Sequence, residues 1–206
     1  MKEKNLLKVE LAFVLTGALV GTLFVWLISI PTAVDFWFVR GNQFLIPRVK
    51  YWLLFGVLLA SGLALSYYIC ILRGWLMSFG HWLESRRILA ILILLLAFPS
   101  GYITGSHFFE FVDPILASLL GSLISVSLVS VAVWLFTLTW KPWLAILVLF
   151  AIPVSYFLTI GVYKSLDLSN LAYDVLRMSS LSGLLSGISG YWLATTQTYS
   201  ASVRAT

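Results

Sequence analysis

Three polar residues stand three positions apart where a long apolar stretch ends, namely His107, Glu110 and Asp113. His107 and Glu110 could share one face of a helix, and an imidazole beside a carboxylate could bind a metal or relay a proton. Two ligands do not complete a metal site, and Asp113 before Pro114 suits the cap of a following helix. We therefore interpret His107 and Glu110 as a polar cluster at a membrane boundary, with the metal or proton-relay role as the alternative.

The rest of the chain offers little for catalysis. The tetrapeptide Gly187-Ile188-Ser189-Gly190 resembles the GxSG motif of rhomboid-type intramembrane proteases, a family that also requires a histidine on a later helix, and no histidine follows His107. Four residues in a Ser/Gly-rich stretch do not carry that resemblance. Cys70 is the only cysteine, which excludes a disulfide within the chain. We expect no enzymatic activity, no metal and no cofactor.

Composition indicates the solvent in which this chain folds. Of its 206 residues 61% are apolar and 10% are charged, and the mean hydropathy is +1.00; soluble domains carry about 25% charged residues. A helix needs about 20 apolar residues to cross a bilayer. Windows without Asp, Glu, Lys or Arg cover residues 11–34, 51–72, 88–109, 115–140, 143–163 and 178–203. The sequence predicts an all-α, polytopic transmembrane helix bundle in a lipid bilayer.

We predict about six spans within a single domain that covers residues 1–206. Their approximate bounds are 9–30, 51–72, 88–109, 114–140, 143–163 and 176–199. Lys141 and Pro142 leave almost no connection between the fourth and fifth spans, which predicts an antiparallel hairpin. The sixth window is rich in Ser, Thr and Gly. Its alternative is a helix buried among its neighbours.

Three connecting segments have amphipathic patterns. Residues 31–50 mix aromatic and basic residues suited to the headgroup layer. Over residues 73–87, Trp75, Leu76 and Trp82 would share one helical face, which predicts a short interfacial helix and a surface for a cytosolic partner. A third pattern, over residues 168–176, predicts an amphipathic helix that continues directly into the last span.

The basic residues are dispersed singly and in small groups, so a net charge of +5 does not indicate nucleic-acid binding. They do bear on orientation, because cytoplasmic loops are enriched in Lys and Arg. Six spans with an internal N-terminus would place Lys2, Lys4, Lys8, Arg73, Arg86, Arg87, Lys141 and Arg204 inside. The other side would hold Arg40, Arg48, Lys50, Lys164 and Arg177. We expect both termini to be cytoplasmic.

Small residues recur four positions apart, which places them on one strip of a helix where two backbones can approach closely. The strips contain Gly17 and Gly21, Gly56 with Ala60 and Ala64, Gly101 and Gly105, and Gly183 and Gly187. The fourth span has a small-residue face made of Gly121 with Ser118, Ser122 and Ser125. They predict tight helix packing, either within the chain or between chains of a homo-oligomer or of other membrane subunits.

Two functions remain in competition. The scarcity of titratable groups in the spans favours a non-enzymatic membrane subunit that oligomerises or docks with partners to anchor, scaffold or sense. The alternative is a hydroxyl-lined channel or carrier for a small solute or ion, which needs no titratable group. Its candidate lining is Ser118, Ser122, Ser125, Ser182, Ser186 and Ser189.

Overall fold

The computed structural model of this chain describes residues 3–29, 46–76, 85–108, 114–166 and 170–203. These ranges contain helices and the turns between them, with no strand. The helices are α1 (Glu3–Ser29), α3 (Ile46–Leu72), α4 (Ser85–Phe108), α5 (Pro114–Thr137), α6 (Pro142–Leu166) and α7 (Asn170–Val203). One helix corresponds to each predicted window, so the all-α fold is confirmed.

Five of these helices are long and apolar enough to cross a membrane. Their qualifying stretches are Asn5–Ile28, Tyr51–Leu72, Ser85–Gly105, Leu119–Thr137 and Pro142–Thr159. The chain is therefore an integral membrane protein. The remaining helix, α7, is the longest and the least hydrophobic of the six.

The place of α7 follows from its contact with α1, one of the two most extensive helix contacts in the fold. Thr22 of α1 meets Ser179 of α7, and Phe13 meets Gly190 nearer the other end, so the helices are antiparallel. Contacts from Val9 to Thr22 extend over about 20 Å at helical rise. The part of α7 from Met178 to Ala194 thus lies alongside the apolar stretch of α1.

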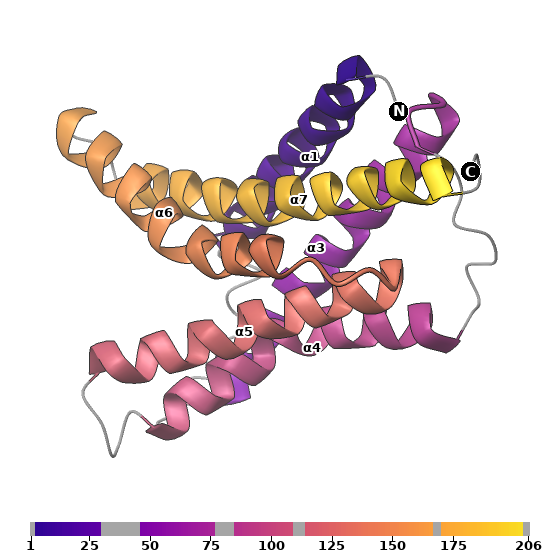
Figure 1. The fold of residues 1–206 in the computed structure, drawn as a ribbon. Coiled ribbons are helices and arrows are strands. Elements are labelled where there is room, and N and C mark those ends of the chain that lie inside the picture. The colour runs from indigo at the N-terminus through magenta and orange to yellow at the C-terminus, as the bar shows by residue number, and fades with distance from the viewer. Residues whose placement is uncertain (1–2, 30–45, 77–84, 109–113, 167–169, 204–206) are drawn as a thin grey trace.

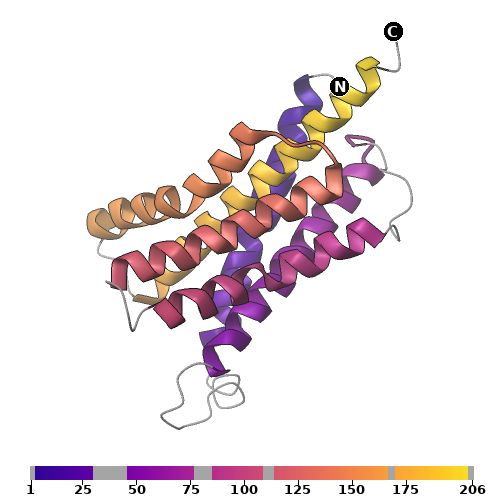
Figure 2. The same cartoon turned by 60° about the horizontal axis from the view of Figure 1, so that its bottom comes forward.

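Successive helices alternate in direction, as Figure 2 shows. The N-terminal end of α1 and the C-terminal end of α7 consequently lie at the same end of the bundle. The other extensive contact joins α4 and α5, which lie side by side in Figure 1 and in Figure 2. The helix α6 packs against α7 as well.

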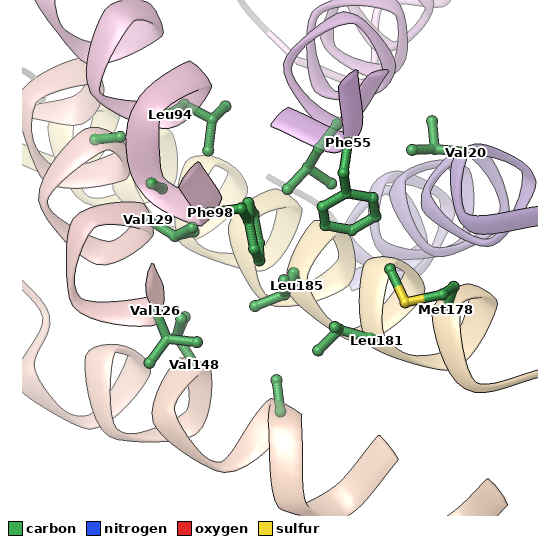
Figure 3. Packing of buried hydrophobic residues seen from close by; sticks show 14 of the residues in the cluster. Val20, Phe55, Leu94, Phe98, Val126, Val129, Val148, Met178, Leu181 and Leu185 are labelled. Carbon is green, nitrogen blue, oxygen red and sulfur yellow. The ribbon is translucent and has the colours of Figure 1, made fainter. Parts of the chain in front are cut away.

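The largest buried cluster takes residues from all six helices (Figure 3). Phe55 and Phe98 are at its centre, with ring centroids 4.7 Å apart in an edge-to-face arrangement. Its other members include Val20, Leu94, Val126, Val129, Val148, Met178, Leu181 and Leu185. Since lipid tails are as apolar as these side chains, close packing rather than exclusion of water stabilises the cluster.

Two segments depart from the prediction because of their backbone conformation. The fourth span was expected to reach residue 140, but α5 ends at Thr137 since Leu138 takes a φ of 56°. A short interfacial helix was expected over residues 73–87. Instead, residues 73–76 form a turn in which Gly74 has a φ of 66°. Residues 85–87 are the first residues of α4. The rest of that segment, like residues 31–45, lies outside the described residues.

Candidate functional site at the basic end of the bundle

Basic residues from four separate segments lie at one end of the bundle, which we call the basic end. They are Lys8 near the start of α1, Arg73 after α3, Arg86 and Arg87 at the start of α4, and Lys141 between α5 and α6. Alternating helix directions bring these segments together (Figure 2). The acidic residues of this end within the described ranges are Glu3 and Glu10, both in α1. The basic end therefore carries an excess of positive charge.

The turn after α3 fixes part of this end. Gly74 reverses the chain, and the amides of Trp75 and Leu76 both donate to the Cys70 carbonyl, at 2.8 and 3.2 Å. Leu76 is then buried among residues of α1, α3 and α7. Trp75 lies beneath Lys8, whose Nζ is 5.7 Å from the ring centroid. Lys8 and Arg73 remain exposed beside this turn.

Arg87 is buried, although its place in a basic pair between two spans predicts an exposed headgroup contact. Its side chain is 2% exposed, and its guanidinium carbon lies 5.5 Å from the ring centroid of Phe136 in α5. The neighbouring Arg86 is half-buried. Sequence reasoning missed the inward direction of Arg87, because the partner ring is distant in the chain and no local pattern indicates it.

The α5–α6 turn is attached to α7. Trp192, which is fully buried, donates from Nε1 to the carbonyl of Thr139 at 2.8 Å. Lys141 donates from Nζ to the hydroxyl of Thr195. Burial of Lys141 lowers the pKa of its amine. The predicted hairpin between the fourth and fifth spans is thus present, and α7 holds its tip.

Below the basic end lies a cavity of about 80 Å³ between α3, α4, α5 and α7. Its walls are almost entirely apolar. The lining residues are Ala60, Leu63, Ala64, Tyr67, Ala90, Ile91, Leu94, Ala132, Val133, Phe136, Ser189 and Leu193. Two of the small residues singled out in the sequence, Ala60 and Ala64, therefore line a space rather than a closed helix contact.

The glycines lie mostly between helices of this chain. Gly17 and Gly21 face the backbone of Ser182 and Met178 in α7, and a β-carbon on Gly187 would lie 2.6 Å from Val14. The remaining contacts join Gly101 and Gly105 to Gly121, Gly56 to the carbonyl of Leu95, and Gly183 to Val14 and Ala18. These are intrachain contacts, and a role in oligomers stays a prediction.

The serines proposed to line a channel are distributed over different contacts. The hydroxyls of Ser125, Ser182 and Ser189 donate to the carbonyls of Gly121, Met178 and Leu185, one turn earlier in their own helices. Ser125 faces Gly101 and Ser186 faces Gly17. Ser122 is half-buried, and the side chain of Ser118 is outside the described residues. A hydroxyl-lined channel stays a prediction.

The polar cluster is only partly described. His107 is exposed in the last turn of α4, at the end of the bundle opposite the basic end. Glu110 and Asp113 lie outside the described residues, so its geometry is not defined. Within the described residues, no three His, Cys, Asp or Glu side chains approach closely enough to hold a metal ion.

Comparison with known proteins returns no match: no family model, no curated protein and no solved structure is similar to this chain.

Proposed function

We propose that this protein is a non-enzymatic integral membrane subunit that anchors an acidic cytosolic partner protein at the basic end of its bundle. The observation that carries the proposal is the convergence of Lys8, Arg73, Arg86, Arg87 and Lys141 from four segments at one end. Both described chain ends lie there too. An excess of basic residues is typical of the cytoplasmic side, so the partner is a cytosolic protein.

Lys8 and Arg73 are the docking residues in this proposal. Both are exposed, and the Gly74 turn with Trp75 holds them at defined positions beside α1 and α3. Charges at fixed positions can match an acidic surface, which speeds association and excludes partners with like charge. The tight glycine contacts join helices of this same chain, so these surfaces are already covered. We therefore propose that the partner binds at the helix ends.

The non-enzymatic role is supported by the scarcity of titratable residues in the membrane spans. The six charge-free windows contain no Asp, Glu, Lys or Arg, and His107 is their only histidine. General acid–base catalysis and proton coupling both need a group that titrates near neutral pH where the reaction occurs. His107 lies at an exposed helix end. Reconstituted protein should accordingly show no proton-driven uptake that His107→Ala abolishes.

Native mass measurement after gentle purification from the host membrane tests the docking. We expect a partner at fixed stoichiometry with the wild type, released by 0.5 M salt because exposed charges are screened. Lys8→Gln with Arg73→Gln should lose it while leaving Lys2, Lys4, Arg86 and Lys141 to preserve orientation. Arg177→Gln, an exposed cation of α7 far from the basic end, is the matched control. A partner retained by the double variant, or no stoichiometric partner at all, contradicts the proposal.

A further inference from the structure

The cavity exists because α3 and α4 diverge toward the basic end. Near their crossing the helices touch: a β-carbon on Gly56 would lie 2.5 Å from the carbonyl of Leu95, and the Phe55 and Phe98 rings are in contact. Closer to the basic end the facing residues are Ala60 and Ala64 of α3 and Ala90 of α4. Methyl side chains cannot fill the widening space, so a cavity remains.

This cavity opens sideways, between α3 and α4. Among its lining residues Ala64 and Ile91 are exposed, whereas Ala90, Ala132, Val133 and Leu193 are buried. Both exposed residues lie within the membrane-spanning stretches Tyr51–Leu72 and Ser85–Gly105. The medium at the mouth is thus the hydrocarbon of the bilayer.

Apolar walls favour an apolar guest. Two hydroxyl-bearing residues, Tyr67 and Ser189, line the cavity beside alanines and aliphatic residues. The hydroxyl of Ser189 donates to the carbonyl of Leu185 in its own helix at 2.7 Å. About 10–15 Å³ admits a water molecule only where two to four polar partners hold it, and an apolar cavity of larger size takes apolar molecules. The 80 Å³ here suits part of a hydrocarbon chain.

Positive charge stands at one end of the cavity. Arg87 precedes Ala90 and Ile91 by one helical turn, and its guanidinium lies over Phe136, which is itself a lining residue. Arg86 adjoins it at the membrane boundary. Guanidinium groups bind phosphate oxygens through paired charge-assisted hydrogen bonds. Cavity and cations together fit a molecule with an apolar chain and an anionic head.

We propose that this cavity holds one acyl chain of an anionic phospholipid from the surrounding bilayer, with Arg86 binding its phosphate and the buried Arg87 adding positive charge beside the cavity. The acyl chain enters the cavity between Ala64 and Ile91 and lies parallel to the acyl chains of the neighbouring lipids. This goes beyond the docking of a protein partner, because the docking residues Lys8 and Arg73 do not line the cavity.

The experiment uses the full-length protein in mild detergent with phosphatidylglycerol or phosphatidylcholine of identical chains. Native mass spectrometry counts the lipids that remain as detergent activation increases. The wild type should retain one phosphatidylglycerol under conditions that strip phosphatidylcholine. Arg86→Gln should lower its affinity about fivefold, which corresponds to about 1 kcal/mol of headgroup attraction per basic residue.

Two variants test whether the cavity holds the acyl chain. Ala64→Trp blocks the mouth and should abolish selective retention, while Leu65→Trp, on the adjacent exposed position of α3, should not. Ala60→Leu fills the cavity from within and replaces Ala64→Trp if that protein fails to fold. Arg177→Gln, at the other end, should retain phosphatidylglycerol like the wild type.

Three results would overturn the proposal. Equal retention of the two phospholipids would show that the protein does not select an anionic headgroup. Unchanged retention in both Ala64→Trp and Ala60→Leu would show that the lipid does not occupy the cavity. Oleate that displaces phosphatidylglycerol at equal concentration would show that the ligand is a free acyl anion. A loss of lipid in Ala64→Trp together with an unaffected protein partner separates this site from the docking surface.

Discussion

Gly17 of α1 lies against the backbone carbonyl of Ser182 in α7, so close that a side chain could not stand between the two helices. Gly21 makes the same kind of approach to Met178 one turn further along. In a bilayer, where lipid competes equally for apolar contacts, backbone proximity allows dispersion and weak hydrogen bonds to accumulate. The contact thus fixes the position of α7, the helix that its composition alone does not assign to the membrane.

Gly17→Val should destabilise the protein without changing its oligomeric state. Its β-carbon would lie 2.5 Å from the hydroxyl oxygen of Ser186 and closer still to the carbonyl oxygen of Ser182. Overpacking of this kind costs about 1–3 kcal/mol. Thermal unfolding in detergent, followed by circular dichroism, measures the change.

Gly161→Ala in α6 is the matched control, because within the described residues nothing beyond the nearby backbone of its own helix lies within 4 Å of the site of its β-carbon. Alanine should stabilise that helix by up to about 0.5–1 kcal/mol. Equal stability of Gly17→Val and the wild type would contradict the α1–α7 packing. A change in native mass would instead assign this strip to an oligomer.

The helix inventory could be predicted from the sequence because crossing a bilayer requires long charge-free windows. Window 143–163 became α6, which begins at Pro142, and window 51–72 became the later part of α3, which begins at Ile46. For α7 the same reasoning had less force. Its hydroxyls at Ser182 and Ser189 face neighbouring helices and bond their own backbone, so the helix needs less hydrophobicity than one that faces lipid.

Trp192→Phe should weaken the attachment of α7 to the α5–α6 turn. The fully buried indole donates to the Thr139 carbonyl at 2.8 Å and packs against Trp140, with ring centroids 6.0 Å apart. Thr139 is half-buried and its carbonyl also accepts from the Thr137 hydroxyl at 3.4 Å, so loss of the indole hydrogen bond should cost about 0.5–1.5 kcal/mol. Trp143→Phe, at a side chain 48% exposed, should change the unfolding free energy by no more than about 0.5 kcal/mol. Similar losses in the two variants would show that the Trp192 hydrogen bond is not what stabilises the turn.

The candidate site could be predicted only in part. Local pattern placed Arg73, Arg86 and Lys141 at one end, since loops between spans alternate sides. Whether a cation turns inward depends on a partner far along the chain, as with Arg87 and Phe136. The cavity was equally hidden, because Ala60 and Ala64 have the spacing of a packing strip and only the divergence of α3 from α4 makes them a lining.

Lys141 should make the protein more stable as the pH rises into the alkaline range. Burial lowers the pKa of this amine below its ordinary value of 10.5. Between the lowered value and 10.5 the unfolded chain binds more protons than the folded one, so stability increases with pH through that window. Below the lowered pKa the amine is charged in both states, and the folded protein bears the full cost of its desolvation.

The difference in unfolding free energy between wild type and Lys141→Met isolates this effect from the other titrating groups. We expect the wild type to gain stability relative to Lys141→Met as the pH rises toward 10.5. A difference that is flat over this range would mean that Lys141 is solvated as in the unfolded chain.

Single cysteines should report opposite sides of the membrane at the two ends of α4. Ser85 is exposed at the basic end and His107 is exposed at the other. With the basic end in the cytoplasm, a membrane-impermeant maleimide should label His107→Cys in intact cells, and Ser85→Cys only after permeabilisation. Cys70 is fully buried, and a Cys70→Ala background removes its contribution.

Because α1 and α7 are antiparallel, a reporter fused after Thr206 should be on the same side as Ser85. If only Ser85→Cys is labelled in intact cells, the orientation is reversed and the basic end, with any partner it docks, lies outside. If the reporter lies on the same side as His107, α7 does not cross the membrane alongside α1.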